Sequence, residues 1–366
     1  MSWMSELRYC LLVASLAACE TPRIAAAPAT EGERSSLERR PNDEKDDHPG
    51  PLPLSRFEVG GDDDACEASP YRAFDFWVGR WNVSQTGSSN LAGTNVVTRT
   101  VDGCAIEEHW SDVAGVRGRS LNSYDAGTRA WHQLWMDETG GSLELSGTGD
   151  GLSMQLAGTH PTNPRDPTPF TDRITWTSVG HRLVRQLGEA SVDGAPFSTV
   201  YDLTYRAVPR EEPIAPSVPQ FCSSLARPRY HAFDFLLGAW SVGPLGSRAR
   251  MRTAVRTDLG GCLVEERMRG PGGYAAVAYS GFRSTTFVWN WMFMDNRGVQ
   301  LLLSGPATLT GTSMVMSGRK IDAQGTPVDV RVEWVSTAPN QVEQRWSFST
   351  DSGATWSTPE VMVMTK

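Results

Sequence analysis

The amino-acid sequence predicts an all-β protein of two tandem antiparallel β-barrels, each entered by a short helix. The first observation is an internal repeat: YRAFDFWVGRWNV at 71–83 returns as YHAFDFLLGAWSV at 230–242, with 8 of 13 positions identical. Such a repeat indicates two copies of one domain. The second is a series of short runs rich in β-branched and aromatic residues between Gly, Asp, Ser and Pro turns, which is typical of strands. Closing the sheet removes its edges, so we expect barrels.

The elements follow in order within each copy. Ser69 is the predicted N-cap of the entering helix, with Pro70 at the first helical position. Predicted strands include CAIEEHW at 104–110, WHQLWM at 131–136, DRITWT at 172–177 and VYDLTYR at 200–206. STDSGATW at 349–356 matches the Asp-box pattern, which predicts a β-hairpin near the end of the second barrel.

The first 18 residues have the features of a secretory signal peptide. Arg8 precedes an apolar run at 9–18 that is too short to span a bilayer. LAAC at 16–19 resembles the lipobox of bacterial lipoproteins, which predicts that Cys19 is acylated and becomes the first residue. The alternative is an ordinary cleavage site. Because Glu20 is not the Asp associated with inner-membrane retention, we expect a lipid anchor in the bacterial cell envelope, at the outer membrane.

Residues 19–65 are expected to form a disordered acidic tether. Residues 20–65 hold 12 acidic and 6 basic residues, and therefore carry −6 of the formal net charge of −8. The rest of the mature chain is nearly neutral and has no Lys or Arg cluster, so nucleic acid is not an expected partner. The repeat sets two barrel domains, 66–209 and 222–366, joined by a Pro-rich linker at 210–221.

The motif Gly-x-Trp opens the first predicted strand of each copy, at 79–81 and 238–240. With the preceding FDFW and the later YDLTYR, it resembles a bacterial domain family of unknown function with lipocalin-like, calycin-type barrels. The resemblance implies the barrel fold and an extracytoplasmic setting, and it implies no activity. In such barrels the Trp packs beneath a basic side chain of the last strand. This implies two structural pairs, Trp81 with Arg206 and Trp240 with Lys366.

Four cysteines remain when Cys10 and the lipid site are set aside, two in each copy. Four thiols allow three pairings, and the duplication selects one of them in an oxidising compartment. The predicted disulfides are Cys66 with Cys104 and Cys222 with Cys262. A zinc or redox site would need closer spacing, so no metal site is predicted.

Glu108 is the main candidate for chemistry. Strand alternation places it on an apolar face with Ile106 and Trp110. Burial there would raise the pKa of the carboxyl unless Arg119 or Gln133 supplied hydrogen bonds. Glu108, Trp110, Arg119 and Gln133 are therefore candidate ligand-binding residues, and Glu108 is alternatively a candidate general acid or base. The alternative is that it caps a loop or pairs with an Arg at the barrel mouth.

Trp131 and Trp135 alternate along one predicted strand and are candidates for lining a site for an apolar or ring-bearing ligand. The alternative is that they belong to the core, since small barrels fill their interior with side chains. The second copy has Val277 and Trp291 at the positions of Arg119 and Gln133. Polar recognition is therefore expected in the first copy only.

We expect an exported lipoprotein that binds or carries a small apolar or aromatic ligand without catalysing a reaction. Two alternatives stay open. One is an enzyme that uses Glu108 with Arg119, and the other is a structural or interaction protein of the envelope with filled barrels. The sequence has no phosphate loop and no hydrolase motif, so no catalytic residue and no cofactor is predicted. The expected partners are the membrane, through the lipid anchor, and the small ligand.

Overall fold

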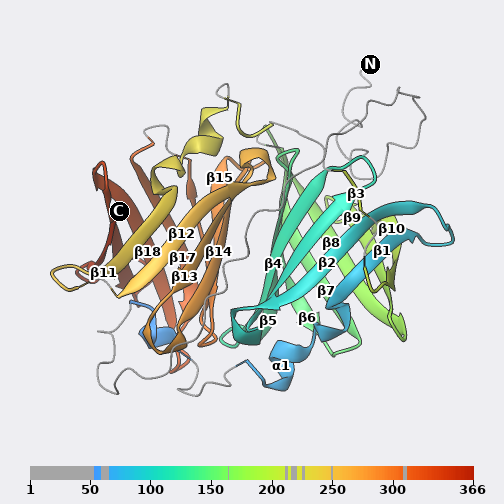
Figure 1. The fold of residues 1–366 in the computed structure, drawn as a ribbon, viewed down its shortest axis with the longest axis horizontal. Coiled ribbons are helices and arrows are strands. Elements are labelled where there is room, and N and C mark those ends of the chain that lie inside the picture. The colour runs from blue at the N-terminus through green and yellow to red at the C-terminus, as the bar shows by residue number, and fades with distance from the viewer. Residues whose placement is uncertain are drawn as a thin grey trace, which may run out of the picture. The chain divides into compact units, whose positions relative to one another are not determined.

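The computed structural model describes residues 53–58, 66–163, 165–210, 213–215, 221–224, 227–248, 250–307 and 311–366. Within these residues the chain forms two closed antiparallel barrels of ten strands each (Figure 1). The predicted all-β fold of two tandem barrels is confirmed. Each strand pairs with its neighbours in sequence, and the first strand of each barrel pairs with the last. No helix of the described residues is long and apolar enough to cross a membrane.

Barrel 1 consists of β1 (Gly79–Gln85), β2 (Leu91–Thr100), β3 (Ala105–Asp112), β4 (Arg117–Asp125), β5 (Ala130–Asp137), β6 (Ser142–Gly149), β7 (Ser153–Asn163), β8 (Asp166–Gly180), β9 (Leu183–Val192) and β10 (Ser198–Ala207). Barrel 2 consists of β11 (Gly238–Pro244), β12 (Met251–Asp258), β13 (Leu263–Arg269), β14 (Ala275–Arg283), β15 (Val288–Asp295), β16 (Gln300–Pro306), β17 (Ser313–Ile321), β18 (Pro327–Ala338), β19 (Gln341–Ser349) and β20 (Glu360–Thr365).

The helical structure is confined to single turns. Helix α1 (Ser69–Arg72) opens barrel 1 and follows Ala68, so Ser69 lies inside the helix and is not its N-cap as predicted. Pro70 still falls in the first turn, where its missing N–H costs no hydrogen bond. The other turns are 3₁₀ helices: η2 (Ser55–Phe57), η3 (Asp75–Trp77), η4 (Val101–Gly103), η5 (Pro228–His231), η6 (Asp234–Leu236), η7 (Leu259–Gly261) and η8 (Pro271–Gly273).

A cluster of aromatic rings closes the end of barrel 1 at which the chain enters. Phe74 stacks on Trp77, with ring centroids 4.8 Å apart, and meets Trp176 edge-on at 5.2 Å. Trp131 packs edge-on against Phe74 at 5.7 Å and donates a hydrogen bond from Nε1 to the Pro70 carbonyl at 3.0 Å. We call this end the base of the barrel and the opposite end its mouth. The base of barrel 2 has the corresponding rings Phe233, Trp289 and Trp334.

Of the two Trp–cation pairs implied by the family resemblance, the structure has one and not the other. Lys366 Nζ lies 4.4 Å from the ring centroid of Trp240. Arg206 is exposed and makes no such contact with Trp81, so that expected pair is wrong. The reason is register: the residue opposite Trp81 in β10 is Ala207, and Arg206, one residue earlier, is turned outward.

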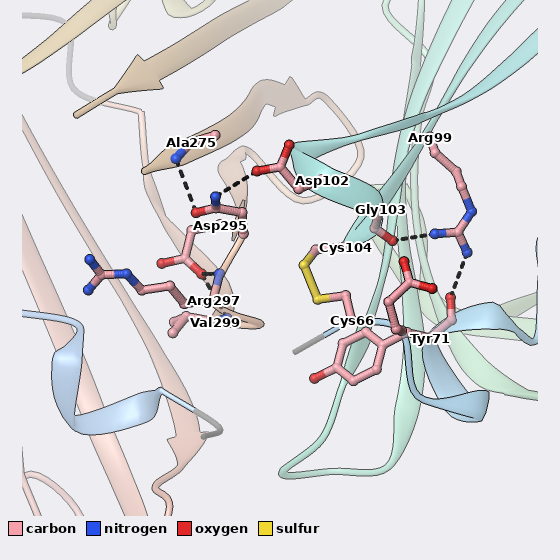
Figure 2. Close-up of a disulfide and its surroundings, with 12 residues drawn as sticks. Cys66, Tyr71, Arg99, Asp102, Gly103, Cys104, Ala275, Asp295, Arg297 and Val299 are labelled. Atoms are coloured by element: carbon pink, nitrogen blue, oxygen red, sulfur yellow. Dashed lines mark hydrogen bonds between the residues drawn. A yellow bond between two sulfur atoms is a disulfide. The ribbon is translucent and has the colours of Figure 1, made fainter. Parts of the chain in front are cut away.

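The structure has both predicted disulfides. Cys66 is bonded to Cys104 and Cys222 to Cys262, each with a Cα–Cα distance of 5.0 Å. Figure 2 shows the first of them beside Arg99, whose guanidinium donates hydrogen bonds to the backbone carbonyls of Gly103 in η4 and Tyr71 in α1. Each bridge ties the segment that enters a barrel to its wall. A disulfide that closes a loop of this size stabilises the fold by up to about 4 kcal/mol, if it acts by lowering the conformational entropy of the unfolded chain.

The two barrels share a buried interface. Glu107 in β3 accepts a hydrogen bond from Tyr279 Oη in β14 at 2.8 Å and pairs with Arg267 in β13. Lys320 in β17 pairs with Asp125 in β4, and both side chains are almost fully buried. Three outward-facing apolar side chains of barrel 1 belong to the same buried cluster as the core of barrel 2: Leu121, Leu134 and Met136.

Residues 53–58 were expected to be part of a disordered tether, and the structure corrects this. Phe57 is 1% exposed, and its ring centroid lies 6.1 Å from that of Phe348 in β19. The Arg56 guanidinium lies 3.5 Å above the same Phe348 ring. Leu54 is buried in the same cluster. Leu54 and Phe57 are enough to dock residues 53–58, because both side chains become buried against barrel 2.

This docked segment covers the mouth of barrel 2. Glu58 accepts a hydrogen bond at 2.6 Å from Arg297, in the turn that joins the mouth ends of β15 and β16. Phe348 also lies on the mouth side, since it is opposite Val330, four residues from the base residue Trp334 in β18. We call residues 53–58 the mouth cover.

Candidate functional site

Strand β3 directs alternate side chains into and out of barrel 1. Glu108 is 4% exposed and is bonded to Asn95 and Ser120 on the two neighbouring strands. Glu107 and His109 point the opposite way, toward barrel 2. The predicted alternation at 104–110 therefore holds, and it places a carboxyl group inside the barrel.

A chain of hydrogen bonds inside barrel 1 ends on this carboxyl. Glu108 Oε1 accepts from Asn95 Nδ2 at 2.6 Å, and Oε2 accepts from Ser120 Oγ at 2.7 Å. Ser120 Oγ in turn accepts from Asn122 Nδ2 at 2.9 Å, and Asn122 Oδ1 accepts from Gln133 Nε2 at 2.8 Å. None of the five side chains is more than 4% exposed. We call them the interior polar chain.

Among the residues that the structure describes, no cation pairs with this carboxyl. Burial raises the pKa of Glu108 to about 7, and the only opposing influences are the hydrogen bonds from Ser120 and Asn95. Burial and then the charge of Glu108 raise the pKa of Tyr201 above its usual value, which places this phenol within electrostatic reach of the carboxyl. Asn95 is fully buried, and its Oδ1 has no hydrogen-bond partner among the described residues. The described interior thus holds a carboxyl group without a paired cation and a carbonyl oxygen without a hydrogen bond. Burying either group lowers the stability of the fold.

Three half-buried aromatic rings lie on the mouth side of this acid. Trp110 follows Glu108 on the same face of β3, Trp135 is opposite Ser120 across β4 and β5, and Tyr201 is in β10. Each ring covers a glycine of the neighbouring strand. A Cβ atom built at those glycines would lie 2.1 to 2.4 Å from a ring atom: Gly93 under Trp110, Gly118 under Trp135 and Gly188 under Tyr201.

These glycines determine where the rings lie. Any larger residue at Gly118, for example, would push the Trp135 ring off the barrel wall, because its side chain would overlap with the ring. With no side chain beneath them, the rings lie against the inner wall and do not extend across the interior. The half-buried rings also remain partly accessible to solvent at the mouth.

Barrel 2 keeps the acid but not its surroundings. Glu266 is buried, its pKa is raised by burial to about 7, and it accepts one hydrogen bond, from Thr253 Oγ1 at 3.0 Å. Trp291, at the position of Gln133, stacks on Phe293 with ring centroids 5.4 Å apart and an interplanar angle of 16°. Trp346, at the position of Gly188, lies edge-on to Trp291 at 6.5 Å. Barrel 2 therefore has large rings at two positions where barrel 1 has a polar side chain and a glycine.

The six predicted ligand-binding residues lie in four places. Glu108 and Gln133 belong to the interior polar chain, and Trp110 and Trp135 lie toward the mouth. Trp131 belongs to the base, where it is 2% exposed and packs against Phe74, so it is a core residue.

The structure corrects the predicted position of Arg119. It lies opposite His109 in the ladder of β3 and β4 and so shares the outer face, and its Nη2 lies 3.0 Å from Asp258 of barrel 2. It therefore cannot bond to Glu108, and the expected pair of Glu108 with Arg119 is wrong.

Sequence reasoning missed Asn95, Ser120 and Tyr201. Ser120 had a signal, because it is adjacent in sequence to Arg119 and must point the other way once Arg119 is placed outside. Asn95 and Tyr201 had none. They lie in β2 and β10, and only the closure of the barrel brings β10 to the same interior as β3.

A separate polar cavity of about 290 Å³ lies between the barrels, on the outer side of β3. Its charged side chains are already paired, Arg119 with Asp258 at 3.0 Å and Arg256 with Glu265 at 2.9 Å. Burial and then Arg119 lower the pKa of His109 to about 4 at this cavity, so its imidazole is neutral at pH 7. We assign these groups to the interface. No group of three His, Cys, Asp or Glu side chains in the described part of the chain could hold a metal ion.

Comparisons with known proteins identify structures but no family. No protein-family model matches the chain, and no curated protein matches it. A crystal structure of a protein of unknown function from the DUF3598 family of Nostoc punctiforme is similar at 8% identity and a TM-score of 0.21, covering 81% of this chain and 98% of that one. A second structure, from work on the asymmetric conductivity of engineered proteins, is similar at 9% identity and a TM-score of 0.18, covering 78% of this chain and 97% of that one.

Proposed function

We propose that this protein is an exported lipoprotein of the bacterial cell envelope that binds a small apolar or aromatic ligand in barrel 1 without catalysing a reaction. The supporting observation is the difference between the two interiors. In barrel 1, half-buried rings lie against the wall above a buried acid with which no cation of the described part of the chain pairs. Ligand sites combine such apolar walls with a few polar groups that fix orientation.

For barrel 2 we propose a structural role. Trp291, Phe293 and Trp346 occupy its interior, and the mouth cover lies over its open end. The enzyme alternative of the sequence analysis loses its proposed pair, because Arg119 is outside the barrel and bonded to Asp258.

Native mass spectrometry of the full chain, released from the membrane fraction of the producing bacterium in mild detergent, tests the binding proposal. We expect an extra mass that disappears on denaturation. Trp135→Leu should lose this mass, while Phe293→Leu, the equivalent change in barrel 2, should keep it. A wild-type spectrum that contains only the acylated polypeptide would overturn the proposal.

The lipid anchor rests on Cys19 and the preceding LAA, which lie outside the described residues. Two disulfides support export to an oxidising compartment. Cys19→Ala should abolish incorporation of radiolabelled palmitate and move the protein from the membrane fraction to the soluble fraction. Unchanged labelling of the variant would refute the assignment.

A further inference from the structure

The interior of barrel 1 also indicates the charge of its ligand, an inference that rests on the proposed function. Glu108 is buried, and it is bonded only to neutral donors, Asn95 and Ser120. The charged or basic side chains adjacent to it in sequence or register, Glu107, His109 and Arg119, are turned to the outer face. A buried carboxylate is ordinarily paired with a cation, and the described residues supply none to Glu108.

Glu108 and Asn95 both have unused hydrogen-bond acceptor capacity. The two oxygens of an ionised carboxylate offer about four lone-pair directions, and the two bonds to Glu108 leave the others free. Asn95 Oδ1 is a further acceptor without a partner among the described residues. An ammonium group carries three N–H donors and no acceptor, so it matches this set, whereas a carboxylate or a phosphate would be repelled.

The rings complete the match. Aromatic faces attract cations, and proteins use aromatic rings to recognise ammonium groups of ligands. Trp110 lies in β3 with Glu108, Trp135 in β5 is opposite Ser120 in β4, and Tyr201 lies within electrostatic reach of Glu108. The apolar body of a ligand would contact the same rings.

We propose that the ligand of barrel 1 is an organic cation, a protonated amine on an aromatic or other apolar body. Its ammonium group would bind to Glu108 and Asn95, and its body would contact Trp110, Trp135 and Tyr201. The other ionisable groups that face this interior are Tyr205 and the pair of His160 with Asp172. Tyr205 donates a hydrogen bond to Gln186 at 2.5 Å, and His160 lies 3.0 Å from Asp172, so none of these groups supplies a cation to Glu108.

The test uses three probes of similar size and different charge: 2-phenylethylammonium, 2-phenylethanol and 3-phenylpropionate. Isothermal titration calorimetry on the full chain at pH 8 should show the ammonium binding at least tenfold more tightly than the other two. Glu108→Gln should remove this preference. The matched change in barrel 2, Glu266→Gln, should keep it.

The wild-type chain provides a second measurement that needs no variant. If Glu108 must be ionised, the affinity for the ammonium should fall about 30-fold between pH 8 and pH 5.5, because only about 3% of a carboxyl with a pKa of about 7 is ionised at the lower pH. The affinity for the alcohol should be unchanged.

Three results would overturn the inference: equal binding of the alcohol or the propionate, a cation preference that survives in Glu108→Gln, or no binding of any probe. The first two would leave the proposed function standing if Trp135→Leu still removed the bound mass in the native spectrum. The proposed function itself fails only if that spectrum contains no ligand.

Discussion

Replacing Glu266 with Gln should make the protein more stable at alkaline pH and change the pH dependence of its unfolding. Glu266 is buried in barrel 2 with one hydrogen bond, from Thr253, and burial raises its pKa from 4.5 to about 7. Because the folded pKa is above the unfolded one, the contribution of this group to stability is fully present below pH 4.5 and is lost as the pH rises through 7. Between pH 5 and pH 8 the loss is about 2 to 3 kcal/mol.

Urea denaturation of the full chain at pH 5, 6, 7 and 8, followed by Trp fluorescence, measures this difference. Other titrating groups contribute equally to wild type and variant, so the gap between the two free energies of unfolding isolates Glu266. The gap should widen by about 2 to 3 kcal/mol from pH 5 to pH 8, with Glu266→Gln the more stable at pH 8. Parallel pH profiles would refute the reasoning, since they would mean that Glu266 is already ionised at low cost in the folded state.

The adjacent Glu265 is a matched control of opposite sign. Burial acts to raise its pKa, but Arg256 and Arg267 hold it below its usual value. A lowered folded pKa gives stability that is present above the unfolded pKa and lost as the pH falls. Glu265→Gln should therefore destabilise the protein, and by more at pH 7 than at pH 4.

Three further predictions concern stability and use urea denaturation of the full chain at pH 7. Phe57→Ala should cost about 3 kcal/mol because its ring is buried at the mouth of barrel 2, and no change in the midpoint would mean that the mouth cover is not docked in solution. Lys366→Ala should cost about 0.5 to 1 kcal/mol through its lost cation–π contact, whereas Arg206→Ala should have no effect; equal effects would contradict the register given above. Gly118→Ala should cost about 1 to 3 kcal/mol because a Cβ would lie 2.1 Å from a ring atom, and Gly180→Ala, with its nearest atom at 3.8 Å, should cost less; the reverse order would refute the proposed ring positions.

Much of the fold could be predicted because its signals are local or repeated. The 13-residue repeat indicated two copies of one barrel domain. The alternation of side chains along 104–110 indicated that Glu108 points into the barrel. The duplication also selected the two disulfides. What failed depended on register between strands distant in sequence. Arg206 is one residue from the position opposite Trp81, and a shift of one residue moves a side chain to the other face.

The candidate site was less predictable, for a related reason. Its acid and two of its rings carry local signals, but Asn95 reaches it through the register of β2 on β3, and Tyr201 only through the pairing of β1 with β10 that closes the barrel. The mouth cover had no signal in composition, because residues 53–58 lie in a segment rich in Pro and charge. Its docking depends on an apolar site on barrel 2, which becomes apparent only in three dimensions.

The differences between the two copies fall into two sets once each side chain is assigned to a face. Val277, where barrel 1 has Arg119, lies on the outer face and is buried against barrel 1, so this difference concerns the interface and not the ligand. Trp291, where barrel 1 has Gln133, lies inside and fills barrel 2. The two copies therefore differ separately on their outer and inner walls. This is possible because successive side chains along a strand point to opposite faces. Substitutions on the outer face should alter how the barrels associate without changing the charge preference of barrel 1. Arg119→Val tests this directly: it should weaken the barrel interface and leave the tenfold preference for the ammonium probe intact, and loss of that preference would place Arg119 in the ligand site after all.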